Sequence, residues 1–329
     1  MESLRTFLGV DGGGSKTAFV LIDEQGHVLA RHTEGSAYYL EIGLGGLRAL
    51  LTRGIGAVLR QASVSEPHYA FLGLPAYGED SRAQKELDSA AWGALPGRRY
   101  HCGNDMVCGW AGALACQDGI NIVAGTGSIA YGEYAGQQAR AGGWGELIGD
   151  EGSAYWLARE GLTLFGRMSD GRAPCGALHT LVRQHFSLTH DLDLCGAIYN
   201  QPVSARSQLA ELARLVVQAA EAGDAAARAL LTRGAEELVA AIGAVRRSLK
   251  VPDGQSIPVS YSGSLFQVRE FLLQPFTRAL AASGAYELIP PRLPPAVGAA
   301  LYAMKLSRRP IGPALLETLA RESAGVPSG

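Results

Sequence analysis

The chain has 329 residues, 47% of them hydrophobic and 18% charged, which is the composition of a globular protein too long for one small core. Its 29 Lys and Arg residues nearly balance 31 Asp and Glu residues, so no basic surface for nucleic acid or an anionic membrane is expected. No apolar run approaches the roughly 18 residues of a membrane span, and no signal segment is expected before the first strand.

The cysteine and histidine residues match no familiar metal or disulfide pattern. The five cysteines are odd in number and include no Cys-x-x-Cys pair, which argues against a disulfide framework and a four-thiolate zinc or iron–sulfur site. The seven histidines include no His-Glu-x-x-His arrangement, so no transition-metal site is expected. We expect most cysteines to be small core residues in a reducing compartment.

The N-terminal part of the chain predicts a mixed sheet with helices. Apolar runs separated by turn residues predict an antiparallel meander of strands over Phe7–Val10, Thr17–Ile22 and His27–Arg31. Apolar residues at helical spacing then predict a helix over 43–62. The remaining predicted elements are a strand over Tyr69–Leu74, a helix over 80–94, a strand over Arg99–Cys102 and a helix that ends at Cys116.

The rest of the chain repeats this pattern and then becomes mostly helical. A second meander is predicted over 120–141, and the stretch with the most glycine, 142–152, follows it. The remaining predicted elements are helices over 153–166, 205–220 and 225–249, a strand over Ile257–Tyr261, and helices over 266–282 and 296–307. The tail beyond Arg309 is expected to be poorly tied down.

Two glycine-rich hairpins, one in each half, are the most informative feature of the sequence. They are Asp11-Gly12-Gly13-Gly14-Ser15-Lys16-Thr17 and Gly125-Thr126-Gly127-Ser128. Glycine lets backbone N–H groups approach a ligand and a nest of such groups binds anions, so both loops are candidate phosphate sites. The first loop is not a Walker A loop, because Ser15 follows Gly14 where lysine is required and a strand comes next. The alternative for either loop alone is an ordinary hairpin turn.

Two aspartates that follow strands are candidates for metal binding and proton transfer. Asp11 can hold the hydration shell of Mg²⁺, which keeps several waters and takes few carboxylates; alternatively it is a turn residue. Asp105 is a candidate general base that accepts a hydroxyl proton. Because Asn104-Asp105 lies between a strand and a helix, the alternative for this pair is a helix N-cap.

The glycine-dense stretch and two later turns are candidates for ligand binding. Trp144 lies near Asp150 in sequence, and a ring with carboxylates can hold a sugar and its hydroxyl groups. The alternative is that Asp150 caps the next helix and Trp144 fills the core. Gly223-Asp224 and Ser262-Gly263-Ser264 precede helices and can face a polar ligand or act as plain caps.

These features together resemble the actin–hexokinase–heat-shock ATPase superfold. More closely, the two hairpins, Asn104-Asp105 and the stretch 142–156 resemble N-acetylglucosamine and glucosamine kinases of the benzoyl-CoA-reductase-activating (BadF/BadG/BcrA/BcrD-type) ATPase family. The resemblance implies two ribonuclease-H-like α/β domains, each a mixed sheet flanked by helices, with the active site in the cleft between them. The domains would be 1–118 and 119–295, with a helix at 296–308 packing back on the first.

The resemblance also implies a role for each matching residue. Asp105 would be the catalytic base, and Asp11 would lie near Mg²⁺, acting through water. ATP would be bound by Asp11, Gly12, Gly13, Gly14, Ser15, Lys16, Thr17, Gly125, Thr126, Gly127, Gly223, Gly263 and Ser264. The sugar would be bound by Tyr38, Asn104, Asp105, Ser128, Ile129, Gly143, Trp144, Gly145 and Asp150. Tyr38 stands where relatives carry a sugar-binding Asn, so N-acetylated, free-amine and other hexoses all stay open as substrates.

The implied activity is phosphorylation of N-acetylglucosamine or glucosamine at the 6-hydroxyl, with ATP and Mg²⁺ and with Asp105 as general base in an in-line transfer. The expected partner is a small sugar, and the expected setting is a cytoplasmic enzyme, with a homodimer as one expected assembly. One alternative is the ATPase activator of an electron-transfer enzyme, but the spacing Cys102-x5-Cys108-x7-Cys116 does not suggest the iron–sulfur cluster it would bridge. Another is a non-catalytic sugar sensor, for which no DNA-binding segment is expected ahead of the first strand.

Overall fold

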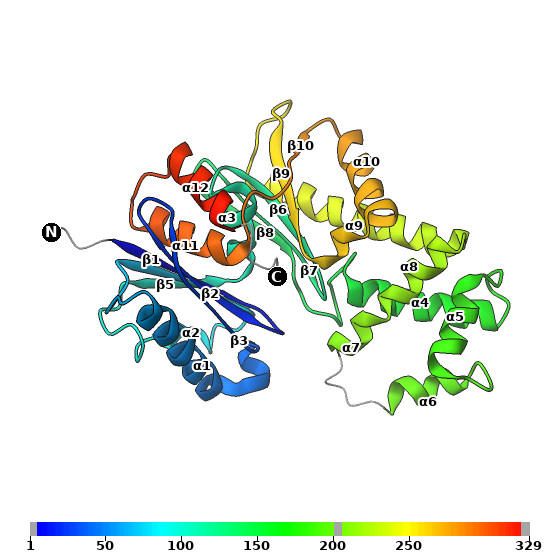
Figure 1. Ribbon diagram of the computed structural model, residues 1–329. Coiled ribbons are helices and arrows are strands. Elements are labelled where there is room, and N and C mark those ends of the chain that lie inside the picture. The colour runs from blue at the N-terminus through cyan, green and yellow to red at the C-terminus, as the bar shows by residue number, and fades with distance from the viewer. Residues whose placement is uncertain (1–4, 201–205, 324–329) are drawn as a thin grey trace. The chain divides into compact units, whose positions relative to one another are not determined.

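The computed structural model describes residues 5–200 and 206–323. The chain divides into two compact units, Met1–Asn121 together with Pro290–Gly329, and Ile122–Ile289. Figure 1 shows that the first contains the strands β1–β5 and the second the greater part of the strands β6–β10. Each unit is described by itself below.

The first unit is built on a five-stranded sheet with the strand order β3-β2-β1-β4-β5. Strands β1 (Thr6–Gly12), β2 (Thr17–Asp23) and β3 (Val28–Glu34) form the predicted antiparallel meander, each slightly longer than expected. Strands β4 (Tyr69–Leu74) and β5 (Tyr100–Asn104) add to β1 in parallel. The carboxyl ends of β1, β4 and β5 therefore meet at one edge of this sheet.

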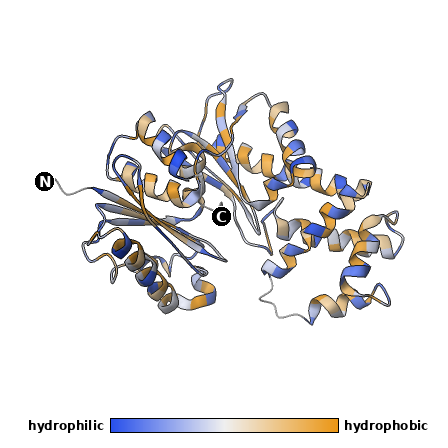
Figure 2. Ribbon diagram, in the orientation of Figure 1, coloured by the Kyte–Doolittle hydropathy of each residue, from blue (hydrophilic) through white to orange (hydrophobic). Residues whose placement is uncertain are grey.

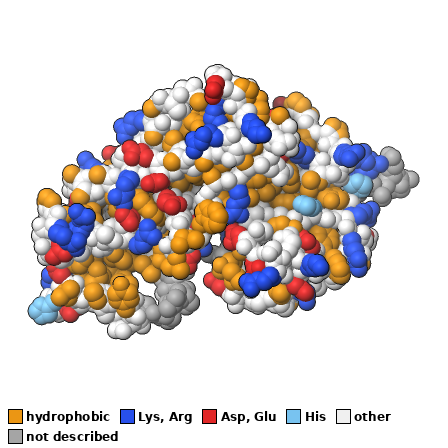
Figure 3. Space-filling model, turned by 180° about the vertical axis from the view of Figure 1, so that it is seen from behind, with side chains coloured by type: hydrophobic (Ala, Val, Ile, Leu, Met, Phe, Trp, Pro, Cys, Tyr) orange, Lys and Arg blue, Asp and Glu red, His pale blue; other side chains and the backbone are white. Residues whose placement is uncertain are grey.

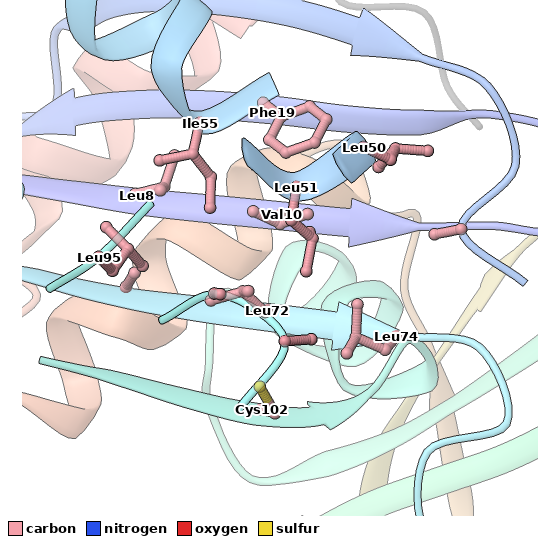
Figure 4. Close-up of a cluster of buried hydrophobic side chains, with 14 of the residues drawn as sticks. Leu8, Val10, Phe19, Leu50, Leu51, Ile55, Leu72, Leu74, Leu95 and Cys102 are labelled. Atoms are coloured by element: carbon pink, nitrogen blue, oxygen red, sulfur yellow. The ribbon is translucent and has the colours of Figure 1, made fainter. Parts of the chain in front are cut away.

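Helices cover both faces of this sheet (Figure 1). They are α1 (Tyr39–Gln61), α2 (Gln84–Asp88), α3 (Met106–Leu114), α11 (Pro295–Leu306) and α12 (Pro313–Ser323). Figure 4 shows how leucine and isoleucine side chains of α1 meet apolar side chains of β1, β2 and β4, among them Phe19 of β2, in one buried cluster. Helix α1 is long and apolar enough to cross a membrane by length and composition alone, yet its Leu47, Leu51 and Ile55 are fully buried in this core.

Glycines allow α11 to pack backbone against backbone. A side chain at Gly9 of β1 would overlap the backbone of Ala300, and one at Gly298 would overlap the backbone of Gly112 in α3. Because neither position carries a Cβ, α11 lies directly on β1 and on α3. This packing fixes the position of α3, which begins immediately after Asp105.

Two expectations for the first unit are wrong. The helix predicted over 80–94 is reduced to Gln84–Asp88 with turns on both sides, because the Asp80 side chain accepts the Arg82 N–H and forms a local turn at 2.9 Å. The tail beyond Arg309 is well packed as far as Ser323, because α12 buries Leu315 and Leu319. Its Glu322 also accepts the N–H of Val28 at 2.6 Å, so α12 covers the edge strand β3.

The second unit repeats the sheet of the first. Its strands are β6 (Gly119–Ala124), β7 (Ser128–Tyr134), β8 (Gln137–Gly142), β9 (Ile257–Ser262) and β10 (Tyr286–Leu288). Their order, β10-β9-β6-β7-β8, is that of the first sheet when β6–β8 are matched to β1–β3. The predicted second meander is confirmed, whereas the short strand β10 was not predicted.

Most of the second unit is helical, and Figure 2 shows hydrophobic and hydrophilic residues side by side on its helices. The α-helices are α4 (Ala154–Ser169), α5 (Ala177–Phe186), α6 (Asp193–Tyr199), α7 (Arg206–Glu211), α8 (Ala213–Glu221), α9 (Ala225–Ser248) and α10 (Gln274–Ala282). Helices α5 and α6 were not predicted. The helix expected over 205–220 breaks at Leu212, and the one over 266–282 begins as a 3₁₀ turn (Ser264–Gln267) and a π turn (Arg269–Leu273).

Charged side chains of both signs are mixed on the surface. Figure 3 shows Lys and Arg next to Asp and Glu over the face that it draws. In the first unit, for example, Arg53 pairs with Glu34 at 3.0 Å and Arg99 pairs with Glu66 at 3.3 Å. Because exposed pairs of this kind contribute at most about 1 kcal/mol each, the buried clusters hold each unit together.

Candidate functional site

The strand register brings Asp11 and Asp105 to one edge of the first sheet. Asp11 in β1 is paired with Gly73 in β4, and Gly73 is paired with Gly103 in β5. Asp105 follows β5 directly. A side chain at Gly73 would lie 2.2 Å from the Cys108 sulfur and 3.2 Å from the Cα of Asp105, so this glycine gives Cys108 and the chain at Asp105 room to pack against β4.

Asp11 is half-buried beside a buried thiol. Burial raises the pKa of the Asp11 carboxyl to about 6, while a hydrogen bond from Cys108 and the charge of Lys16 oppose the rise. Cys108 lies on α3, with its Sγ 3.6 Å from the carbonyl oxygen of Val10. Burial and the neighbouring carboxyls of Asp11 and Asp105 raise the pKa of this thiol, so it stays protonated.

Asp105 carries the most strongly raised carboxyl pKa that the structure resolves to a value. Burial raises it to about 7, and the charges of Asp11 and Glu79 add to the rise. A carboxyl group with a pKa near neutrality is suited to accept a proton during a reaction.

The cap interpretation holds for Asn104 and not for Asp105. No side-chain cap bond is made by Asp105 at the start of α3. Instead, Asn104 Oδ1 accepts the N–H of Met106 at 3.1 Å, and Asn104 Nδ2 donates to the carbonyl of Tyr77 at 3.1 Å. Asn104 is buried and ties the β4–α2 connection to α3, which leaves the Asp105 carboxylate outside the cap.

The first glycine loop presents free backbone donors. Gly13 donates to the carbonyl of Lys16 at 2.9 Å and closes the hairpin. Within the described part of the chain, no hydrogen bond is made by the N–H groups of Gly14, Ser15 and Lys16, and all three residues are exposed. Thr17 differs, because it is buried and its hydroxyl donates to the carbonyl of Gly35 at 2.8 Å.

Tyr38 is less open than a sugar-binding residue on a loop would be. It is half-buried against the core cluster of the first unit. Its N–H donates to the Ser36 hydroxyl at 3.1 Å in a local turn that leads into α1. The structure therefore places Tyr38 just before the helix, at a position that the core fixes.

The second glycine loop rests on the first turn of α4. Gly125 donates to the carbonyl of Gly127 at 2.9 Å, which tightens the turn. The first two N–H groups of the helix, those of Ala154 and Tyr155, donate to the carbonyls of Gly125 and Thr126 at 2.9 and 3.2 Å. Thr126 itself is exposed. The loop carbonyls thus satisfy the helix end while the side chain of Thr126 faces outward.

Asp150 is buried against this second loop. Its Oδ1 accepts the N–H of Ser128 at 3.3 Å, and its Oδ2 forms an ion pair with Arg206. The proposed cap role of Asp150 is wrong, because Ser153 caps α4 by accepting the N–H of Trp156 at 3.2 Å. Burial raises the pKa of the Asp150 carboxyl, and Arg206 opposes that rise.

The glycine-dense loop exposes apolar side chains. Trp144 is 72% exposed, Leu147 83% and Ile148 74%, so the interpretation of Trp144 as a core residue is wrong. Gly143 and Gly145 on either side of the ring have φ angles of +68° and +84°. A side chain at Gly143 would lie 2.6 Å from Ile129, which brings this half-buried residue of β7 next to the loop.

The two later turns differ in what they leave free. Asp224 is a plain cap of α9, since it accepts the N–H groups of Ala226 and Ala227 at 3.0 and 3.2 Å, and Gly223 before it has a φ of +90°. Ser264 is exposed on a cavity of about 410 Å³. A side chain at Gly263 would overlap the carbonyl of Ala124 at the end of β6, so this turn lies directly on the strand that precedes the second loop. Other residues that line this cavity are Ala154, Arg214, Val217, Gln218 and Leu265.

The donor set at Asp11 fits a hydrated magnesium ion. Among residues 5–200 and 206–323, no group of three or more His, Cys, Asp or Glu side chains could hold a metal ion directly. Mg²⁺ needs no such group, because it keeps several waters and uses one or two carboxylates. Asp11 and Asp105 supply two half-buried carboxyls whose mutual repulsion a nearby cation would relieve.

Three side chains near these sites were not predicted as site residues from the sequence. Cys108, Glu79 and Arg206 each act on a candidate aspartate, although no motif marks them. Cys108 sits one turn into α3 after Asp105, so helical spacing could have indicated it. Arg206 is 56 residues from Asp150 along the chain and carries no local signal.

A protein family and a characterised relative each match most of the chain. The family model described as the BadF/BadG/BcrA/BcrD ATPase family matches residues 8–303. The N-acetyl-D-glucosamine kinase of Dictyostelium discoideum is 28% identical over 314 residues, which cover 92% of this chain and 98% of that protein.

Solved structures share the fold. A candidate N-acetylglucosamine kinase from Chromobacterium violaceum superposes with a TM-score of 0.70 at 28% identity, over 91% of this chain and 99% of that one. A ROK family glucokinase from Streptomyces griseus, solved with glucose and AMPPNP, gives a TM-score of 0.56 at 16% identity over 91% and 99%, a likeness of fold alone. The expected actin/hexokinase-like class, with two mixed sheets each flanked by helices, is confirmed.

Proposed function

Because the chain belongs to the BadF/BadG/BcrA/BcrD ATPase family, we propose that it is an ATP-dependent sugar kinase acting on N-acetylglucosamine or glucosamine at the 6-hydroxyl. The observation that carries this proposal is the half-buried Asp105 at the strand ends, whose pKa is about 7. The names of its relatives, which include an N-acetyl-D-glucosamine kinase, give the substrate class.

Asp105 acts as the general base. A carboxylate with a pKa near neutrality is ionised in much of the enzyme at cellular pH and still binds a proton well. It accepts the proton of the sugar hydroxyl as that oxygen attacks the γ-phosphoryl group. Asn104, which is held by Met106 and Tyr77, fixes the backbone from which Asp105 projects.

The glycine loops bind the phosphates of ATP. In the first loop the N–H groups of Gly14, Ser15 and Lys16 and the ammonium of Lys16 donate to phosphate oxygens, with Gly12 and Gly13 giving the backbone room to approach. In the second loop, Gly125-Thr126-Gly127, the exposed side chain of Thr126 donates to a phosphate oxygen. When bound near Asp11, Mg²⁺ neutralises phosphate charge. Gly223, Gly263 and Ser264 contribute to the adenosine side of the second unit, where Ser264 lines the cavity of about 410 Å³.

The second loop and the glycine-dense loop bind the sugar. Trp144 is exposed and can lie against the apolar face of a pyranose, while Gly143 and Gly145 allow the loop to adjust. Asp150 accepts hydrogen bonds from sugar hydroxyls, and Ser128 and Ile129 line the same pocket. A hydrogen bond to a buried carboxylate is lost for a molecule that lacks the hydroxyl, so Asp150 discriminates against such molecules.

A coupled assay of ADP release tests this proposal. Purified protein is mixed with ATP and Mg²⁺ and with glucosamine, N-acetylglucosamine or glucose, and the phosphorylated position of the product is read by phosphorus–proton NMR. We expect ADP release that depends on an amino sugar and a product phosphorylated at the 6-hydroxyl. Strong ATP hydrolysis without sugar would favour an ATPase activator, and sugar binding without turnover would favour a sensor.

A further inference from the structure

Arg206, at the start of α7, holds the buried carboxylate Asp150. Its Nη2 forms an ion pair with Asp150 Oδ2, and its Nε lies 3.3 Å from Glu146 Oε2. The Asp150 side chain is only 3% exposed, whereas that of Arg206 is 36% exposed. A buried carboxylate needs a partner, and Arg206 is the cation that the described part of the second unit supplies to it.

This pair lies directly on the second glycine loop. A side chain at Gly127 would lie 2.5 Å from Arg206 Nη2 and 2.9 Å from both carboxylate oxygens of Asp150. The other Asp150 oxygen accepts the N–H of Ser128. The carboxylate is thus fixed from two sides, by the loop backbone and by the guanidinium group.

Asp150 also has an unusual backbone. Its φ is +58°, a left-handed conformation that side chains rarely adopt, and Asp tolerates it better than most residues. Such a residue stays in place only where its surroundings determine it. Among the described residues, the Ser128 N–H and Arg206 are the polar partners of its carboxylate.

We propose that Arg206 is a positioning residue for sugar binding, which holds the Asp150 carboxylate ionised and in one orientation toward the sugar hydroxyls. The inference rests on the proposed sugar kinase function. It adds a residue of the helical segment α5–α8 that no motif marks and that does not itself contact the sugar.

The charges around Asp150 determine the pH dependence that follows. Arg206 on α7 lowers the pKa of Asp150 and Glu146 on the same loop raises it, while the contact from β7 is the uncharged N–H of Ser128. Loss of the guanidinium charge therefore raises the pKa of Asp150. In an Arg206→Gln variant the carboxylate takes up a proton at a higher pH than in the wild type, and sugar affinity falls at a correspondingly higher pH.

The test measures the dissociation constant of N-acetylglucosamine by calorimetry from pH 5 to pH 8, together with KM and kcat. For Arg206→Gln we expect about a tenfold or larger increase in the sugar dissociation constant at pH 7, an unchanged KM for ATP and a smaller change in kcat. The pH below which sugar binding weakens should move upward. Arg206→Lys keeps the charge but lacks the planar fork, so its pH profile should stay with the wild type while its affinity falls.

Arg183→Gln is the matched control. Arg183 on α5 has a side chain that is 38% exposed, and it pairs with Asp191 in the loop after that helix. Its loss therefore removes a similar ion pair elsewhere in the same unit. If Arg206→Gln binds the sugar as Arg183→Gln does, with the same pH profile, the inference is overturned although the kinase activity stands. If the wild type phosphorylates no sugar, the proposed function fails instead. If Arg206→Gln does not fold, the Arg206→Lys affinity decides.

Discussion

Asp105 combines a reactive position with a cost in stability. It lies beside Asp11 and near Glu79, and the negative charge of each makes the ionisation of Asp105 less favourable. A carboxyl held in this way gives up its charge more readily than an exposed one, which suits a base that must take a proton. The same placement weakens the folded state whenever Asp105 is ionised.

We expect turnover to depend on Asp105. Asp105→Asn removes the base without changing the size of the side chain, so the fold and the binding of ATP should persist while kcat falls by at least about 10²-fold. Steady-state kinetics with the sugar found in the ADP-release assay would measure this, with Asp170→Asn on the exposed C-cap of α4 as the control. Near-normal turnover by Asp105→Asn would show that another group takes the proton.

We also expect Asp105 to make the free energy of unfolding depend on pH. The pKa of Asp105 rises from an ordinary 3.8 to about 7 on folding. The contribution of this group to the free energy of unfolding is therefore fully present below about pH 4, where it is protonated in both states, and is lost as pH rises through 7. Asp105→Asn avoids this loss and should be more stable than the wild type by roughly 1–3 kcal/mol at pH 8. Urea unfolding should show the difference shrinking toward pH 5. A difference that is constant over this range would mean that Asp105 does not titrate as described.

Among the elements, α11 depends most on the absence of side chains. Gly298→Ala would drive a Cβ into the backbone of Gly112 and to within 2.6 Å of the Cys108 carbonyl. Since backbone cannot move aside as a flexible side chain can, we expect a loss of about 2–4 kcal/mol in the free energy of unfolding. Activity should fall as well, because α3 carries Cys108 and starts at Asp105.

Gly166→Ala on α4 is the comparison for this substitution. Nothing lies within 4 Å of a Cβ at Gly166, so alanine there should stabilise the helix by about 0.5–1 kcal/mol. Thermal and urea unfolding of both variants would measure the contrast. Equal effects of the two substitutions would mean that α11 and α3 are not packed backbone against backbone.

Elements with strong local signals could be predicted from the sequence. The strand Tyr69–Leu74 is a buried apolar run stopped by proline, and α9 begins after a capping Asp224, so both were predicted closely. The prediction of a helix over 80–94 is wrong because the Asp80 side chain forms a local turn with Arg82 instead. Helix α6 is only seven residues long and buries none of its side chains, so its local signal is short.

The candidate site divides in the same way. Asp11 lies at the end of β1 and Asp105 follows β5, so their meeting at one sheet edge could be expected from the order of the elements. The contact between Cys108 and Asp11, like that between Arg206 and Asp150, depends on how helices pack across long separations in sequence. Such contacts follow from tertiary packing, which local patterns do not encode.

For the whole molecule, the informative fact is that the chain builds the same sheet twice. The orders β3-β2-β1-β4-β5 and β8-β7-β6-β9-β10 correspond strand for strand. In each sheet the hairpin between the first two strands of the meander is the glycine loop. The two loops are therefore equivalent positions of a repeated design, and the sequence prediction that both bind the phosphates of one nucleotide can be tested by substitution.

Lys16→Ala in the first unit and Thr126→Ala in the second are the two substitutions. Both side chains are exposed, so neither change should alter the stability of its unit by more than about 0.5 kcal/mol. If each loop contributes donors to the same nucleotide, each variant should raise the dissociation constant of an ATP analogue several-fold, by calorimetry. The double variant should bind more weakly than either single one, and Lys85→Ala on exposed α2 should bind normally. An effect confined to one loop would leave the other as a plain hairpin turn, and the proposed ATP site would then have to be built without it.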